Sequence, residues 1–147
     1  MANRETIYRD LLFFIKSDLA SNITDPIVGK RNTRSAFVMT SYPHKFTEYP
    51  LITVKITNLT ANRAGMQTDR LDIDLTLEIR IWSKSQAQRD KLTQQIIDRL
   101  ADIQFSASGS IDSDFHDFGI LSSLDVDEPE VKIFSKVIGA QYRFFNA

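Results

Sequence analysis

The chain has 147 residues, the size of one ordinary domain, and 42% of them are hydrophobic, so a sizeable core can form. Its formal net charge of −1 gives the whole molecule no attraction to nucleic acid or to a membrane surface. Because the sequence has no cysteine, it excludes disulfides, thiolate zinc sites and cysteine nucleophiles, and it fits either a reducing compartment or a core that is stable without cross-links. We therefore expect a single domain over residues 1–147.

The first predicted element is a helix over residues 4–20. Apolar residues recur along one stripe and charged residues occupy the rest, which is typical of a helix that packs on a core by one face. The longest apolar run in it, residues 11–15, is too short to cross a bilayer, so we expect no membrane contact. The stripe consists of Ile7, Leu11, Phe14, Ile15 and Leu19, flanked by Tyr8 and Leu12.

Two strands are predicted next, a short one over residues 36–40 and a clear one over residues 51–57. In the second, apolar residues alternate with Thr and Lys, the period of a half-buried strand. Residues 58–70 have no such period, so we predict a long loop or hairpin tip there. A loop of this length without secondary structure is uncommon in a compact domain and usually has a function.

Residues 72–82 give the cleanest strand signal in the chain. Five apolar side chains alternate with polar ones, which places them on one face, and we predict that this strand is central in its sheet. Ser83 and Gln86 then match the capping-box pattern S-x-x-Q at the start of a helix. The apolar residues of that helix recur at helical spacing: Leu92, Ile96, Ile97, Leu100 and Ile103.

The C-terminal part predicts a flexible connection over residues 106–111, a short strand or turn over residues 115–121, and a long strand over residues 131–145. The apolar phase of the last strand changes near residues 134–136, which predicts a bulge or twist. Gly139 is the expected point of close backbone approach. This order of elements predicts an α+β fold, a mostly antiparallel sheet with two main helices packed on one face.

Few residues suggest chemistry. Asp112, Asp114, His116 and Asp117 are of types that bind metals, but the glycine at position six and the glutamate at position twelve of a calcium loop are missing, so we interpret them as a solvated acidic loop. His44 follows a serine that lacks the glycine elbow of a nucleophile. We expect no catalytic residues, no metal and no cofactor.

Charge is segregated along the chain. Residues 100–131 hold eight acids and no Lys or Arg, whereas residues 30–70 hold seven bases and two acids. Either the two segments neutralise each other within one monomer, or the basic side of one copy meets the acidic side of the next in a head-to-tail contact that closes a ring. The candidate interface residues lie in these segments: Arg63, Met66, Arg70, Asp112, Asp114, Phe115, Asp117 and Phe118.

Four stretches suggest a family. They are the helix with I-Y-R-D-L-L-F at residues 7–13, the strand with Y-P-L-I-T-V at 49–54, the strand ending in I-R-I-W-S at 79–83 and followed by a helix, and the aromatic strand with Q-Y-R-F at 141–144. In their order and texture they resemble the tail terminator, or tail completion, proteins of long-tailed phages and related viruses or prophages. The resemblance spans nearly the whole chain.

The resemblance implies a structural virion protein and no enzyme. Such a protein forms a homo-oligomeric ring, expected to be a hexamer, that caps the tail tube, ends its polymerisation and joins the tail to the head connector or neck protein. DNA passes through the ring without specific binding, and the protein resides in the virion tail after assembly in the host cytoplasm. The acidic segment then faces either the lumen or a neighbouring subunit. The alternatives are another neck or minor tail protein, or a small ligand-binding α+β domain.

Overall fold

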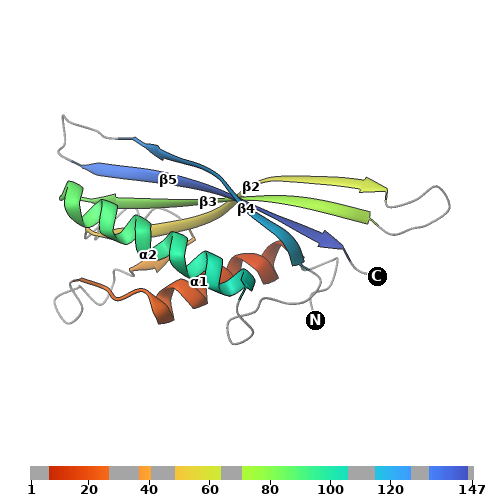
Figure 1. Ribbon diagram of the computed structural model, residues 1–147, viewed down its shortest axis with the longest axis horizontal. Coiled ribbons are helices and arrows are strands. Elements are labelled where there is room, and N and C mark those ends of the chain that lie inside the picture. Colours follow the sequence, from red (N-terminus) through yellow and green to blue (C-terminus); the bar gives the residue numbers. More distant parts are fainter. Residues whose placement is uncertain are drawn as a thin grey trace.

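A computed structural model describes residues 7–26, 37–40, 49–63, 71–105, 115–126 and 133–145. The strands form one sheet in the order β1-β2-β3-β5-β4, in which only the β1–β2 pair is parallel, and both helices lie on the same face (Figure 1). The predicted α+β fold is confirmed. The elements are α1 (Ile7–Asn22), β1 (Val38–Met39), β2 (Leu51–Arg63), β3 (Leu71–Ser83), α2 (Gln86–Phe105), β4 (Phe115–Asp125) and β5 (Phe134–Phe145).

Strand β3 is central, as its alternation predicts. It pairs with β2 on one side and with β5 on the other along almost its whole length. The alternating apolar residues Ile73, Leu75, Leu77, Ile79 and Ile81 are all buried on the face that meets the helices. No helix in the described part of the chain is long and apolar enough to cross a membrane.

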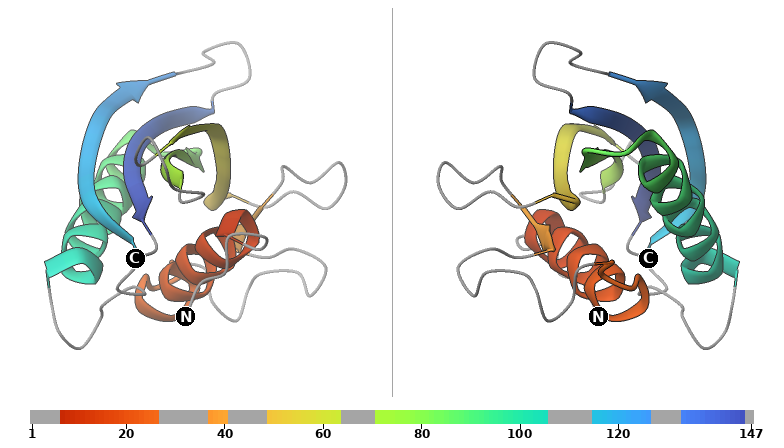
Figure 2. Two further views of the ribbon diagram at one scale, coloured as in Figure 1. Left: turned by 90° about the vertical axis from the view of Figure 1, so that its right-hand side faces the viewer. Right: turned by 90° about the vertical axis from the view of Figure 1, so that its left-hand side faces the viewer.

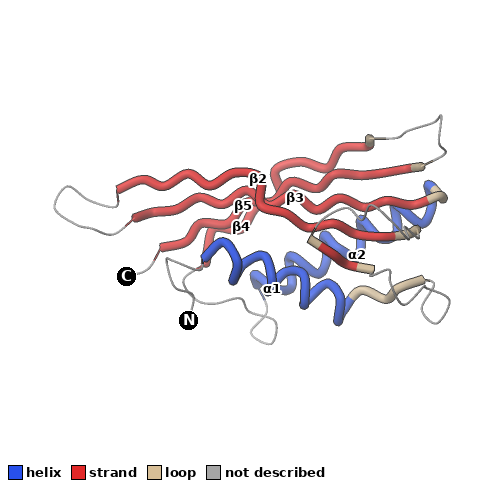
Figure 3. Tube along the Cα trace, turned by 180° about the vertical axis from the view of Figure 1, so that it is seen from behind, coloured by secondary structure: helices blue, strands red, loops and turns tan. Residues whose placement is uncertain are grey.

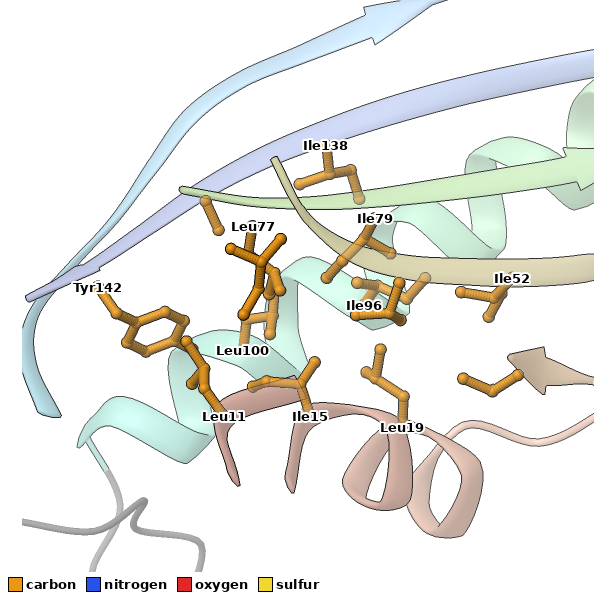
Figure 4. Close-up of a cluster of buried hydrophobic side chains, with 14 of the residues drawn as sticks. Leu11, Ile15, Leu19, Ile52, Leu77, Ile79, Ile96, Leu100, Ile138 and Tyr142 are labelled. Atoms are coloured by element: carbon orange, nitrogen blue, oxygen red, sulfur yellow. The ribbon is translucent and has the colours of Figure 1, made fainter. Parts of the chain in front are cut away.

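The core lies between the sheet and the two helices. Leu11, Ile15 and Leu19 of α1 point toward Ile96 and Leu100 of α2 and toward the buried face of the sheet (Figure 4). This confirms the predicted apolar stripe of the first helix at Leu11, Phe14, Ile15 and Leu19. Replacing one such leucine by alanine typically costs about 2–5 kcal/mol, because it leaves a cavity.

An ion pair fastens α1 to α2 beside this core. Asp18 accepts two hydrogen bonds from Arg99, 2.6 Å from Nε to Oδ1 and 2.8 Å from Nη2 to Oδ2. The hydrogen bond with Asp18 raises the pKa of the Arg99 guanidinium above its already high value. The two helices are therefore joined by packing and by a bidentate pair, whose fixed geometry resists sliding of one helix along the other.

The β2–β3 hairpin projects past both helices (Figures 1 and 3). The prediction of a loop over residues 58–70 is wrong for its first six residues, because β2 continues to Arg63 and pairs with β3 throughout. A bulge between Ile56 and Asn58 shifts the register and breaks the apolar period. Residues 58–61 are also exposed, so this half of the strand needs no hydrophobic alternation.

Strand β4 is longer than its sequence suggests, and β5 is more regular. Two register shifts, between His116 and Gly119 and between Ile120 and Ser122, interrupt β4 and hide its period. Of the bulge or twist predicted near residues 134–136, the bulge is wrong, because β5 pairs with β3 in unbroken register from Phe134 to Phe145, and the twist stays a prediction. The change of apolar phase in the sequence falls where this regular strand begins.

The N-terminus of α2 lies two residues beyond the predicted cap. Ser83 is the buried last residue of β3, and Ser85 caps the helix by accepting a hydrogen bond from the Gln88 backbone N–H at 3.4 Å. The Ser83 hydroxyl donates to Gln88 Oε1 at 2.8 Å and accepts from the Ser85 N–H at 3.1 Å. The sequence contains two overlapping S-x-x-Q patterns, and the helix uses the second one, which begins at Ser85.

Candidate functional site: the two edges of the sheet

The sheet presents two strand edges. Strand β1 covers β2 only at Ile52 and Thr53, so residues 58–63 of β2 pair on one side only within the described chain. Strand β4 likewise pairs only with β5 among the described strands. The end-on views in Figure 2 show β4 and β2 toward opposite sides of the curved sheet. Such edges expose backbone donors and acceptors that another strand can pair with.

The direction of the strands makes these two edges compatible. Neighbours alternate in direction across β2, β3, β5 and β4, so β4 runs opposite to β2. If the β4 edge of one copy is laid beside the β2 edge of a second copy, the new pair is antiparallel and the alternation continues. Antiparallel pairing is the slightly more stable of the two arrangements.

The two edges also differ in charge. Strand β2 belongs to the basic segment, residues 30–70, and β4 to the acidic segment, residues 100–131, and two strands separate them. Within the described residues the segments do not neutralise each other, because Lys55 of β2 lies 3.9 Å from Glu78, and Asp125 of β4 pairs with two other cations. The two edges thus belong to segments of opposite formal charge in the sequence, and the described charges Lys55 and Asp125 are paired locally.

The structure describes the backbone at half of the predicted interface residues. Arg63 ends β2, and Phe115, Asp117 and Phe118 lie on β4, although their side chains are not described. The register places Arg63 and Phe115 at the same end of the sheet but on opposite edges. The other four lie outside the described residues: Met66, Arg70, Asp112 and Asp114.

A buried cation that sequence reasoning missed lies at the base of the β4–β5 hairpin. Arg89, in the first turns of α2, is 1% exposed, and its Nη2 lies 3.1 Å from Asp90 Oδ1 and 3.6 Å from Asp125 Oδ2. Lys136 of β5 approaches the same two carboxylates, at 3.5 and 3.2 Å. A signal for it was present, because Arg89 falls three residues before Leu92 on the buried stripe of the helix.

This four-charge cluster fixes the end of the β4 edge. A buried charge is stable only when it is paired. Arg89 therefore holds Asp125, the last residue of β4, against α2. Burial pushes the pKa of Asp90 upward, but the hydrogen bond and charge of Arg89 and the charge of Lys136 outweigh it, and that pKa lies below its ordinary value. Both carboxylates, Asp90 and Asp125, are neutralised by cations, so the role of the cluster that its geometry supports is to hold these elements together.

The hollows of the described surface do not suggest catalysis. One hollow of about 370 Å³ lies between residues 24–26 and α2 and is lined by Thr24, Gln88, Lys91, Leu92 and Gln95 among others. These side chains include no pair of nucleophile and general base. Among the described residues no group of three His, Asp or Glu is placed to hold a metal ion.

The sequence offered two candidates for a chemical role, His44 and the acidic cluster at residues 112–117, and the expectation that neither has one stays a prediction. His44 lies outside the described residues, as do Asp112 and Asp114 of the acidic cluster. His116 and Asp117 lie on β4, but only their backbone is described. The interpretation of this cluster as a solvated acidic segment is therefore untested.

A similar fold occurs in a chain of a gene transfer agent particle. No protein-family model and no curated protein sequence matches this chain. Among solved structures, it is similar to a chain of the virion of a native gene transfer agent particle, with 9% sequence identity and a TM-score of 0.59. The match covers 94% of this chain and 96% of that chain, so the likeness extends over nearly the whole of both chains. At this identity the shared property is the α+β fold.

Proposed function

We propose that this protein is a structural virion protein of a phage-like particle, and that it forms the ring that caps the tail tube. In this role it ends polymerisation of the tube and joins the tail to the head connector or neck protein. The likeness in fold to a chain of a gene transfer agent virion, over nearly all of both chains, supports a role in such a particle. The resemblance of the sequence to tail terminators supports the position.

One observation carries the ring. The monomer has two strand edges that match in direction and belong to segments of opposite formal charge. Strand β4 ends the strand order on one side, and on the other side β2 extends beyond the short strand β1. A two-fold contact of β4 with β4 would bring two acidic strands together, whereas β4 against β2 brings acid to base. Head-to-tail contacts of this kind close into a ring when the rotation permits.

Termination of the tube follows from occupied edges and loops. A tube subunit adds by matching a free surface of the last ring, and a cap that fits this surface without renewing it stops addition. The partners are other copies of this protein, the tail tube protein and the connector, and DNA passes through the hole. This function needs no reaction and no cofactor, and it places the protein in the virion tail after assembly in the host cytoplasm.

A charge exchange tests the ring. We expect Arg63→Glu and Asp117→Lys each to lower the mass of the assembled protein, measured by native mass spectrometry, and the double variant to restore it. Asp98→Lys on the exposed surface of α2 is the control and leaves the mass unchanged. A stable ring needs about 800 Å² buried on each side of a contact. A wild-type protein that stays monomeric both alone and with tail tubes contradicts the proposal.

Another neck or minor tail protein is the second candidate, because the virion similarity holds for any part of the particle. Immunoelectron microscopy of intact particles separates the two. Labelling at the junction of tail tube and head supports the terminator, and labelling elsewhere on the tail supports the alternative.

A further inference from the structure

Neither helix packs on the second face of the sheet, and this face is rich in charge. Alternate residues of β3 lie on it, together with residues of β2 and β5 that are opposite them in the register. Its charged residues with described side chains are three acids and three bases: Asp72, Asp74, Glu78, Lys55, Arg80 and Arg143. We call this the polar face.

Each of the three cations lies beside a partner on that face. Arg143 Nε is 3.3 Å from an oxygen of Asp72 and 3.3 Å from an oxygen of Asp74. Lys55 Nζ is 3.9 Å from Glu78. The polar face thus neutralises itself through contacts between neighbouring strands.

The third cation is held by an aromatic ring. The Arg80 guanidinium lies 4.1 Å from the centroid of the Trp82 ring, and Trp82 Nε1 is 3.4 Å from Thr53 Oγ1 on the adjacent strand. A guanidinium over an indole face is attracted by the negative electrostatic potential of the neutral ring's π face. The hydrogen bond to Thr53 orients the indole, so Arg80 is held on a fixed support.

Ring closure decides where this face points, and the inference therefore rests on the proposed function. When a sheet with helices on one face closes on itself, the helices lie outside, because the outer circumference has room for them. The polar face then lines the hole. We propose that this face is the wall along which duplex DNA passes, and that its paired cations keep the wall from holding the DNA backbone.

The physical reason is the way proteins hold DNA. Affinity comes mostly from Lys and Arg that neutralise phosphates and release counterions. On this face Arg143 and Lys55 must leave their carboxylates before they neutralise a phosphate, and three carboxylates repel the phosphates. Removing the acids next to Arg143 should therefore convert a surface that lets DNA slide into one that binds it.

Duplex binding by fluorescence anisotropy tests this. We expect wild-type protein to bind a short duplex weakly, and Asp72→Asn with Asp74→Asn to bind about tenfold more tightly at about 50 mM salt and to lose the gain at about 200 mM. The control, Asp98→Asn with Asp102→Asn on exposed α2, makes the same change in net charge and leaves binding unchanged. Adding Arg143→Gln to the first pair should abolish the gain.

Several outcomes overturn the inference: tight, salt-sensitive binding by the wild type, equal gains in the test and control pairs, or a gain that survives Arg143→Gln. A change in the mass of the assembly caused by Asp72→Asn with Asp74→Asn also overturns it, because the face would then be a protein contact. Native mass spectrometry of the wild type separates the two proposals. A monomer refutes the ring, whereas a ring that grips DNA refutes only the role of the polar face.

Discussion

The two halves of strand β2 differ in what holds them. Before the bulge, Ile52, Val54 and Ile56 are buried under the helices. After it, residues 58–61 are exposed, Leu59 is 39% exposed, and nothing in the described chain pairs with their outer edge. One strand thus serves as core in one half and as free surface in the other. The difference indicates which residues fold the domain and which are available to partners.

An apolar residue can be replaced by aspartate in each half of β2, and the buried half should show the largest effect of all the variants. Val54→Asp buries an unpaired carboxylate and should lower the free energy of unfolding by about 4–5 kcal/mol, enough to unfold many domains. Leu59→Asp should change it by about 0.5 kcal/mol or less, because the site is exposed. Urea denaturation followed by circular dichroism measures both. Similar losses in the two variants would contradict the division of the strand.

The cluster at the base of the β4–β5 hairpin should give the next largest effect. Arg89→Met leaves Asp125 without its buried partner and should cost about 2–3 kcal/mol, less than a fully buried pair because both carboxylates are half exposed. Lys91→Met on the same helix is exposed and should cost about 0.5 kcal/mol or less. The same denaturation assay compares them, and equal losses would show that Arg89 is not a structural anchor.

Weakening the ion pair between Asp18 of α1 and Arg99 of α2 should have a smaller effect. Asp18→Asn weakens a bidentate, partly buried pair with Arg99 and should lower the free energy of unfolding by about 1–2 kcal/mol. The pair stabilises the packed core and lies on neither edge of the sheet. Ring assembly should therefore persist in this variant at temperatures where the protein is folded. Thermal denaturation and native mass spectrometry together check the prediction, which fails if the ring is lost while the domain stays folded.

The smallest expected effect is a dependence on pH. The pKa of Asp90 is lowered in the folded protein, so its contribution to stability is present above its unfolded pKa of about 3.9 and is lost as the pH falls below that value. Asp90→Asn should therefore lower the stability slightly at neutral pH, and the difference from the wild type should disappear at acid pH, which flattens the acid limb of the stability curve. Denaturation between about pH 2 and pH 6 measures this. An unchanged acid limb would remove Asp90 from the cluster.

What could be predicted from the sequence follows the same division. Strand β3 and the stripe of α1 were predicted correctly, because burial on one face imposes a period on the residues. The far half of β2 was missed, and β4 was predicted only as a short strand or turn over residues 115–121, since exposure removes that period and bulges shift it. Arg89 was missed for another reason: its partner Asp125 is far along the chain, and only the fold brings the two together.

The candidate site was predictable in part. Segregation of charge in the sequence indicated a basic and an acidic side, and the sheet order places the strands of these segments on opposite edges. The direction of the edges and their shared end could not be predicted, because both depend on which strands are neighbours. The self-neutralising pairs of the polar face depend on register between strands, which no local pattern encodes.

The alternating directions of β2, β3, β5 and β4 have a consequence for the size of the proposed ring. Because the number of alternating strands is even, every repeat starts and ends with opposite polarity, and any number of copies joins without a parallel seam. Strand direction therefore allows a ring with either an even or an odd number of copies. The copy number is set by the angle at which one sheet meets the next, so small changes at the edges, rather than in the core, would change the diameter of the hole.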